Sequence, residues 1–189
     1  VKLLLNNRRV DLNKTNNYGQ TPFYIACRNG YNEIVKLLLN DHRVDINKTN
    51  ESGWTPFYVA CFYGHIEIVK LLLNNQRVDV NKANECDQTP FWIACELGQP
   101  EIIEYVIASG REVNVNTKNK NGQTAIDVAT IKGNEEKGLW ETKEIFQKRK
   151  RGCLKIVELL ESFERDSIET RFKLRRKLGL IGKIQSKSI

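Results

Sequence analysis

The sequence contains no methionine, and only two of its 189 residues are histidine. No apolar run approaches the ~18 residues that a membrane-spanning helix requires, and the N-terminus lacks the charged-then-apolar pattern of a secretory signal. The apolar share of 40% is enough for a packed core and too low for an integral membrane protein. Because residue 1 is not methionine, we expect a fragment or a processed product, from which targeting signals would be missing.

Sequence motifs for catalysis and cofactor binding are also missing. The chain has no C-x-x-C pair, no HExxH, no GxxxxGK[ST] and no GxGxxG. The two histidines, His42 and His65, are expected in loops, with no nucleophile marked beside them. We therefore expect no enzyme activity, no cofactor and no metal site.

Positive charge is concentrated at one end of the chain. Residues 1–133 contain 15 basic and 14 acidic side chains, whereas residues 134–189 contain 15 and 9. The formal net charge of +7 thus comes mostly from the C-terminal part. A neutral body of this kind is not expected to wrap nucleic acid.

A sequence repeat dominates the chain. TPFYIACRNG begins at Thr21, TPFYVACFYG at Thr55 and TPFWIACELG at Thr89, a spacing of 34 residues in both steps. A weaker copy, TAIDVATIKG, begins 35 residues later at Thr124. The blocks between the copies match as well, for example EIVKLLLNDHRVDIN and EIVKLLLNNQRVDVN. Periods of this length indicate an array of stacked units.

Each unit carries the signals of two short antiparallel helices. Threonine stands where an N-cap hydroxyl is favoured, and proline follows at the first helical position in three copies. A second helix is expected to begin near Glu33, Glu67 and Glu101. Glycine is expected to end the first helix in a left-handed conformation, at Gly30, Gly64, Gly98 and Gly133.

The period and the pattern TP-x-x-x-A/C…G…EIVKLLL…VDIN resemble the ankyrin repeat, in the style of expanded ankyrin families of single-celled eukaryotes. The resemblance implies an all-α fold, an α-solenoid of helix-turn-helix repeats, and binding of proteins rather than catalysis. The family's TPLH is TPFY or TPFW here, so Tyr24, Tyr58 and Trp92 replace its histidine. We expect these aromatic side chains to stack between adjacent units and stiffen the array.

Three cysteines recur at one repeat position, where the family has its second alanine. Stacked units would place Cys27, Cys61 and Cys95 about 10 Å apart, beyond the ~7 Å limit for a disulfide. We expect them to be reduced and buried, which favours a cytoplasmic location, with the nucleus as an alternative.

We expect the ankyrin repeat array over residues 1–166 and a basic C-terminal helix or tail over residues 167–189. The array would comprise a partial repeat at 1–15, repeats at about 16–49, 50–83 and 84–118, and a degenerate repeat at 119–166 with an insertion at 134–152.

The insertion and the C-terminal segment depart from the repeat. Trp140, Ile145 and Phe146 indicate that part of the insertion packs. Further on, Asp166 and Glu169 have capping-box spacing, which predicts a last helix that forms a helical C-terminal cap. Its side chains Ile168, Phe172 and Leu178 are expected to cover the final apolar face.

Positions that vary while the scaffold is constant indicate the binding surface. In ankyrin-like proteins they lie at the loop tips and on the inner helices, on one concave face. The expected partner-binding residues are Tyr18, Arg28, Glu51, Trp54, Phe62, Tyr63, Glu85, Glu96 and Leu97. Trp54, Phe62 and Tyr63 would be apolar anchors, and the charged residues would tune complementarity. The alternative is that Trp54 or Phe62 only packs against a neighbouring repeat.

The predicted function is that of a non-catalytic, monomeric scaffold or adaptor that binds a protein partner. A second hypothesis is a basic-tail adaptor that docks to nucleic acid or to an anionic membrane. It is based on the basic run Lys148–Arg151 and on the mixed basic and apolar residues at 171–178. A third is a repeat fragment of a larger multidomain enzyme with its catalytic site elsewhere.

Overall fold

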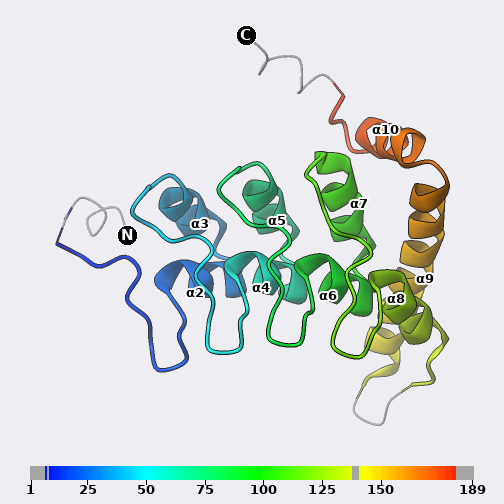
Figure 1. Ribbon diagram of the computed structural model, residues 1–189, viewed down its shortest axis with the longest axis horizontal. Helices are drawn as coiled ribbons and strands as arrows, with labels where there is room; N and C mark the ends of the chain where they lie inside the picture. The colour runs from blue at the N-terminus through cyan, green and yellow to red at the C-terminus, as the bar shows by residue number, and fades with distance from the viewer. Residues whose placement is uncertain (1–6, 8, 138–140, 182–189) are drawn as a thin grey trace.

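The computed structural model describes residues 7, 9–137 and 141–181, which form a row of helix pairs closed by two further helices (Figure 1). The first helices of the pairs are α2 (Pro22–Arg28), α4 (Pro56–Tyr63), α6 (Pro90–Glu96) and α8 (Ala125–Asn134). The second helices are α3 (Asn32–Leu39), α5 (Ile66–Leu73) and α7 (Pro100–Ser109). Helices α9 (Lys143–Arg165) and α10 (Ser167–Lys177) follow.

No strand occurs among these described residues, so the expected all-α solenoid of helix-turn-helix repeats is confirmed. In Figure 1 the first helices lie side by side in a middle row, the second helices form a row above them, and the connecting loops project on the opposite side. Within the described part of the chain, every helix is too short or too polar to cross a membrane.

The threonine caps form as expected. The hydroxyl oxygens of Thr21 and Thr55 each accept from a backbone N–H three residues on, at 3.0 Å. Thr89 caps α6 in the same way, and Thr124 caps α8 with a full capping box that includes Asp127. A cap of this kind contributes about 1 kcal/mol, and helices this short need it because they are not stable alone.

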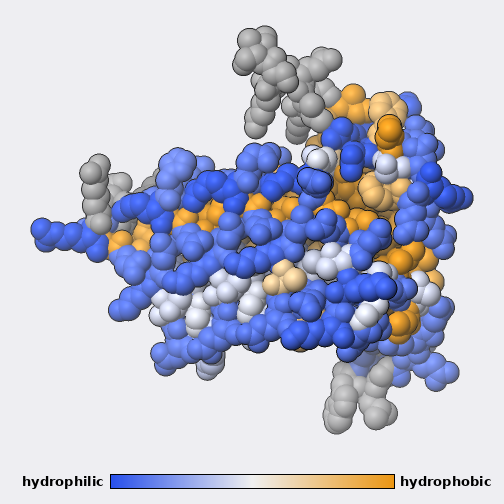
Figure 2. All heavy atoms as spheres, in the orientation of Figure 1, coloured by the Kyte–Doolittle hydropathy of each residue, from blue (hydrophilic) through white to orange (hydrophobic). Residues whose placement is uncertain are grey.

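The core lies between successive helix pairs. The phenylalanine after each proline, Phe23, Phe57 and Phe91, is at most 2% exposed. The three repeat cysteines are fully buried beside them and carry no disulfide, as expected. Figure 2 shows the result from outside: hydrophilic residues cover most of the visible face, and an apolar band follows the array toward α9 and α10. Each buried phenylalanine stabilises the stack by about 1.5–3 kcal/mol.

The aromatic residues that replace the family's histidine are buried between repeats, and each uses its polar atom to reach the next loop. The Tyr24 hydroxyl accepts from Nδ2 of Asn50 at 3.2 Å. Tyr58 receives the same bond from Asn84, at 3.2 Å. Trp92 donates through Nε1 to the carbonyl of Gln123, at 3.1 Å. Among the described residues these three rings do not stack on one another, so the expected stacking is wrong, and burial together with inter-repeat hydrogen bonds joins the units at this position instead.

A second series of inter-repeat hydrogen bonds, which we call the asparagine ladder, is made by the asparagine that ends each VDIN-type motif. Nδ2 of Asn47 donates to the carbonyl of Arg77 at 2.7 Å, and its Oδ1 accepts from the N–H of Asp79 at 2.9 Å. Asn13 and Asn81 make the same pair of bonds one repeat earlier and one repeat later. Each asparagine thus holds the backbone of the following repeat at a fixed register.

Gly133 does not end its helix, contrary to the expectation. Gly30, Gly64 and Gly98 have φ values of +76°, +74° and +62°, but Gly133 lies inside α8, which continues to Asn134. The reason is that no second helix begins directly after it. Instead the side chain of Leu154, from α9, packs on Gly133.

Helix α9 begins inside the expected insertion and continues without a break to Arg165. Of the side chains expected to pack, Phe146 is buried, whereas Ile145 is 58% exposed, so that part of the expectation is wrong. Trp140 lies outside the described residues. The second half of α9 takes the place of the missing second helix and packs on α8 and α7.

The last helix caps the array with a different face from the one expected. Ile168 and Phe172 are 82% and 54% exposed, and the buried side chains are Thr170 and Leu174. This orientation of α10 about its own axis is held by two of its basic residues, because Arg171 and Arg175 donate to the carbonyls of Ile107 and Ala108 at the end of α7. Leu178 does pack on the core.

Candidate functional site

The loop tips form one continuous rigid edge. The N–H of Glu51 donates to the carbonyl of Tyr18 at 3.2 Å, and Glu85 makes the equivalent bond to Ser52 at 3.4 Å. Each loop is also closed from within, since an asparagine such as Asn50 accepts two backbone N–H groups through Oδ1. The side chains of Tyr18, Glu51 and Glu85 are exposed on this edge. We call the surface made by the loop tips and the first helices the first-helix face.

Three aromatic side chains form a connected row along α4, which we call the aromatic row: Trp54, Phe62 and Tyr63. The ring centroids of Trp54 and Phe62 are 5.1 Å apart, and those of Phe62 and Tyr63 are 5.0 Å apart. Trp54 also lies 5.0 Å from the buried ring of Tyr58. Trp54 and Phe62 are half-buried, and Tyr63 is 45% exposed. The row is therefore anchored in the core on one side and open on the other.

Arg28 reaches the aromatic row from the preceding repeat. Its Nε donates to the Tyr63 hydroxyl at 3.4 Å, and its guanidinium lies 5.8 Å from the centre of the ring. The imidazole of His65 holds the same corner, because its Nε2 lies 2.8 Å from the carbonyl oxygen of Arg28. That distance requires Nε2 to carry the proton. His65 therefore caps the end of α2, a structural role that sequence reasoning left open.

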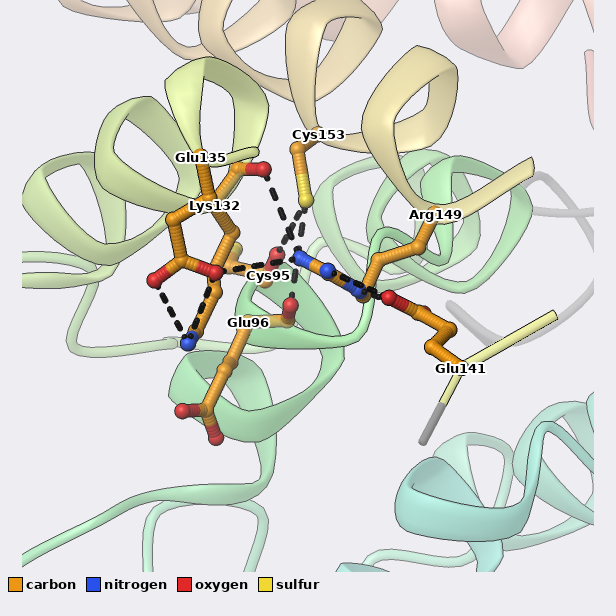
Figure 3. A network of polar contacts seen from close by, with 7 residues as sticks. All are labelled: Cys95, Glu96, Lys132, Glu135, Glu141, Arg149 and Cys153. Atoms are coloured by element: carbon orange, nitrogen blue, oxygen red, sulfur yellow. Dashed lines mark hydrogen bonds and ion pairs between the residues drawn. The ribbon is translucent and has the colours of Figure 1, made fainter. Parts of the chain in front are cut away.

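Glu96 and Leu97 occupy the positions in the third repeat that Phe62 and Tyr63 occupy in the second, and both are half-buried. A polar network lies behind them (Figure 3). Arg149 pairs with Glu141 at 2.9 Å and with Glu135 at 3.6 Å, and Lys132 pairs with Glu135 at 2.8 Å.

The Glu96 carboxylate takes no part in this network. In Figure 3 no dashed line reaches it, and among the described residues none forms a hydrogen bond or ion pair with it. Burial raises the pKa of the Glu96 carboxyl, an effect that Lys132 and Arg149 oppose and Glu135 reinforces.

The first half of α9 forms one wall of a groove of about 600 Å³. The opposite wall is made by the turns of the second and third repeats, including Tyr63, Ile66 and Leu97, while α9 contributes Ile145 and Lys148. The aromatic row and this groove share Tyr63, so they are neighbouring surfaces. The repeat pattern does not reveal the groove, because its walls are more than 40 residues apart in sequence.

The buried cysteines near these surfaces offer little reactive chemistry. Burial raises the pKa of the Cys27, Cys61 and Cys95 thiols well above the ordinary range, and that of Cys153 to about 11. Thiols with raised pKa values are poor nucleophiles. Among the described residues, no three His, Cys, Asp or Glu side chains gather where they could hold a metal ion.

Comparison with known families gives a match over most of the chain. The model of the family described as "Ankyrin repeats (3 copies)" matches residues 1–84 and 76–138. Both matched segments end before α9 and α10, so these helices, and with them one wall of the groove, lie beyond the part that the family model covers. A search of curated proteins finds no match.

Proposed function

Because the chain belongs to the ankyrin-repeat family, whose members are generally protein–protein interaction modules, we propose that it is a non-catalytic scaffold or adaptor. It binds its protein partner through the first-helix face. The aromatic row provides the apolar anchors, and Arg28, Glu51, Glu85, Glu96 and Leu97 surround it, with Tyr18 at the edge.

The single observation that supports this proposal best is the aromatic row itself. Its rings are fixed by contact with one another and with Tyr58, yet Tyr63 is exposed and Trp54 and Phe62 are partly so. Rigid, part-exposed aromatic residues lose little conformational entropy on binding and are common energetic centres of protein interfaces. The inter-repeat hydrogen bonds of the buried aromatic residues and of the asparagine ladder hold the face in place. The scaffold therefore loses little conformational entropy when it binds a partner.

The basic-tail hypothesis is weaker, because the chain uses many of these basic residues internally. In the run Lys148–Arg151, the guanidinium of Arg149 is paired with Glu141. In α10, Arg171 and Arg175 bond the end of α7, and Lys177 pairs with Glu104 at 2.6 Å. Fewer basic groups remain for nucleic acid or an anionic membrane than the sequence indicates.

We further propose that the protein acts as a monomer in the cytoplasm or the nucleus. The buried cysteines, which carry no disulfide, support a reducing compartment.

The test is affinity capture from an extract of the source cell with wild type and with a Trp54→Ala/Tyr63→Ala double variant. At least one partner should be recovered by wild type and lost with the double variant. Recovery of the same partners by both proteins would reject the first-helix face as the interface.

Phe172→Ala is the matched control. Phe172 is an aromatic residue that is 54% exposed on α10, which lies apart from α4 (Figure 1). This variant should recover the same partners as wild type. Because Trp54 is half-buried, thermal unfolding of all variants must show that they are folded at the temperature of the capture.

A further inference from the structure

Charge on the first-helix face is divided by repeat. The loop and first helix of the second and third repeats, residues 50–64 and 84–98, contain four acidic residues and no basic one. The acidic residues are Glu51, Glu85, Asp87 and Glu96. By contrast, residues 16–30 contain one basic residue, Arg28, and no acidic one. On a chain with a net charge of +7, the centre of the first-helix face is therefore locally acidic.

The acidic centre coincides with the aromatic row. Glu96 stands at the end of α6, at the repeat position that Phe62 occupies in α4, and neighbouring helices lie about 8–10 Å apart. Nε2 of Gln99 donates to the carbonyl of Phe62 at 3.1 Å and ties the two helix ends together. Burial, and after it the charge of Glu96, raises the pKa of the Tyr58 hydroxyl, and the ring of Tyr58 contacts Trp54. Glu96 and the aromatic row thus belong to one surface.

Glu96 is the half-buried carboxylate of this surface that lacks a partner. Lys132, the cation that lowers the pKa of Glu96 most, is engaged by Glu135 at 2.8 Å. Arg149 is engaged by Glu141 and Glu135. Half-burying a carboxylate without pairing it costs free energy, which an incoming cation would recover.

Aromatic faces beside a carboxylate form a favourable environment for a lysine or arginine side chain. The cation is attracted to the ring faces, its aliphatic stem packs on apolar surface, and its polar end bonds the carboxylate. Exposed carboxylates at the loop tips add longer-range attraction and speed the encounter.

We propose that the partner presents a lysine- or arginine-bearing segment to this face, with one cationic group beside Glu96 and its stem along Trp54 and Phe62. This inference rests on the proposed function and specifies the chemistry of the partner. Glu51 and Glu85 attract neighbouring basic residues of the same segment. An acidic or purely apolar segment would leave Glu96 half-buried and unpaired.

The test uses a phage library of random dodecamer peptides selected on the full chain, with counter-selection on the Trp54→Ala/Tyr63→Ala variant. The selected peptides should be enriched in lysine and arginine over the unselected library. Their affinity, measured by fluorescence anisotropy with the synthetic peptides, should fall at least tenfold for Glu96→Gln.

Glu158→Gln is the matched control, because Glu158 is an exposed carboxylate on α9, away from the aromatic row, and its loss changes the net charge equally. The affinity of this variant should stay within twofold of wild type. Equal losses for Glu96→Gln and Glu158→Gln would overturn the assignment of the cation to Glu96.

The outcomes separate the two proposals. Peptides that depend on Trp54 and Tyr63 but show no excess of basic residues would overturn the cationic partner and leave the first-helix face as the interface. A selection that enriches no peptide dependent on Trp54 and Tyr63 would contradict both.

Discussion

Gly152 of α9 packs directly on the backbone of Gly98, in the turn between α6 and α7, and a Cβ at Gly152 would overlap the Gly98 carbonyl. Neither residue leaves room for a side chain, because a Cβ at Gly98 would in turn meet the carbonyl of Arg149. This approach of two backbones is what lets α9 cross the end of the array and bring its basic first half against the turns of the repeats.

Gly152→Ala should therefore destabilise the protein by about 1–3 kcal/mol through overpacking, measured as a lower midpoint in urea. The sign is diagnostic, since alanine in place of glycine inside an unconstrained helix raises stability by up to about 1 kcal/mol. Gln147→Ala, on the exposed side of the same helix, should change stability by less than about 0.5 kcal/mol. A raised midpoint for Gly152→Ala would show that α9 does not lie against Gly98.

Asn47→Ala should cost about 1–3 kcal/mol, because it removes two inter-repeat hydrogen bonds and leaves their backbone partners unsatisfied. Urea unfolding is again the measurement. The comparison is Asn40→Ala, an exposed residue at the end of α3. If both variants unfold at the same midpoint, the asparagine ladder does not stabilise the array.

Thr55→Ala should lower stability by about 1 kcal/mol through loss of the N-cap of α4. Thr130→Ala, inside α8, removes a hydroxyl that bonds the carbonyl of Ile126 and should be close to neutral. An unchanged urea midpoint for Thr55→Ala would show that the hydroxyl does not serve as a cap.

Glu96 predicts a pH-dependent difference between wild type and Glu96→Gln. Because burial raises the pKa of Glu96 in the folded state, its ionisation opposes folding as the pH rises through that pKa. Glu96→Gln should therefore be more stable than wild type at pH 7, and the gain should disappear below the pKa of the unfolded chain, about 4.3. Lys132, Glu135 and Arg149 face the group and are unchanged in the comparison. A gain that is constant with pH, or a loss at pH 7, would contradict this environment for Glu96.

Thiol labelling tests the burial of the core directly. Of the five cysteines, Cys86 alone is exposed, at a loop tip, and the other four are buried. Native protein should react rapidly with one equivalent of a thiol reagent such as DTNB, and urea-unfolded protein with five. Cys86→Ser should lose the rapid reaction entirely. Rapid labelling of a second thiol would show that a repeat opens in the native state.

The sequence predicts the helix pairs and their stacking because the signals for both are local. Thr55, Pro56 and Gly64 each act within a few residues of their own position, so the helix pairs and their stacking follow from the repeat. The expected positions of Tyr18, Glu51 and Glu85 at exposed loop tips follow for the same reason. The aromatic row could be anticipated as a group, but the contacts of its rings with Tyr58 could not.

Where packing depends on distant residues, the sequence predictions fail. Gly133 continues its helix because no second helix begins directly after it, and Leu154 packs on it from α9. Gly152 meets Gly98 across 54 residues of sequence. The hydrogen bonds of Arg171 and Arg175 to the carbonyls at the end of α7 determine which face of α10 packs on the array. This orientation of α10 leaves Phe172 exposed. No periodicity marks such contacts, because each occurs once.

The most direct test of the first-helix face as the binding surface is hydrogen–deuterium exchange of the protein with and without a captured partner. Binding through this face should slow exchange in residues 50–64 and 84–98 and leave α10 unchanged. Slowing confined to residues 143–177, with both first-helix segments unaffected, would contradict it and identify the basic helices as the interface.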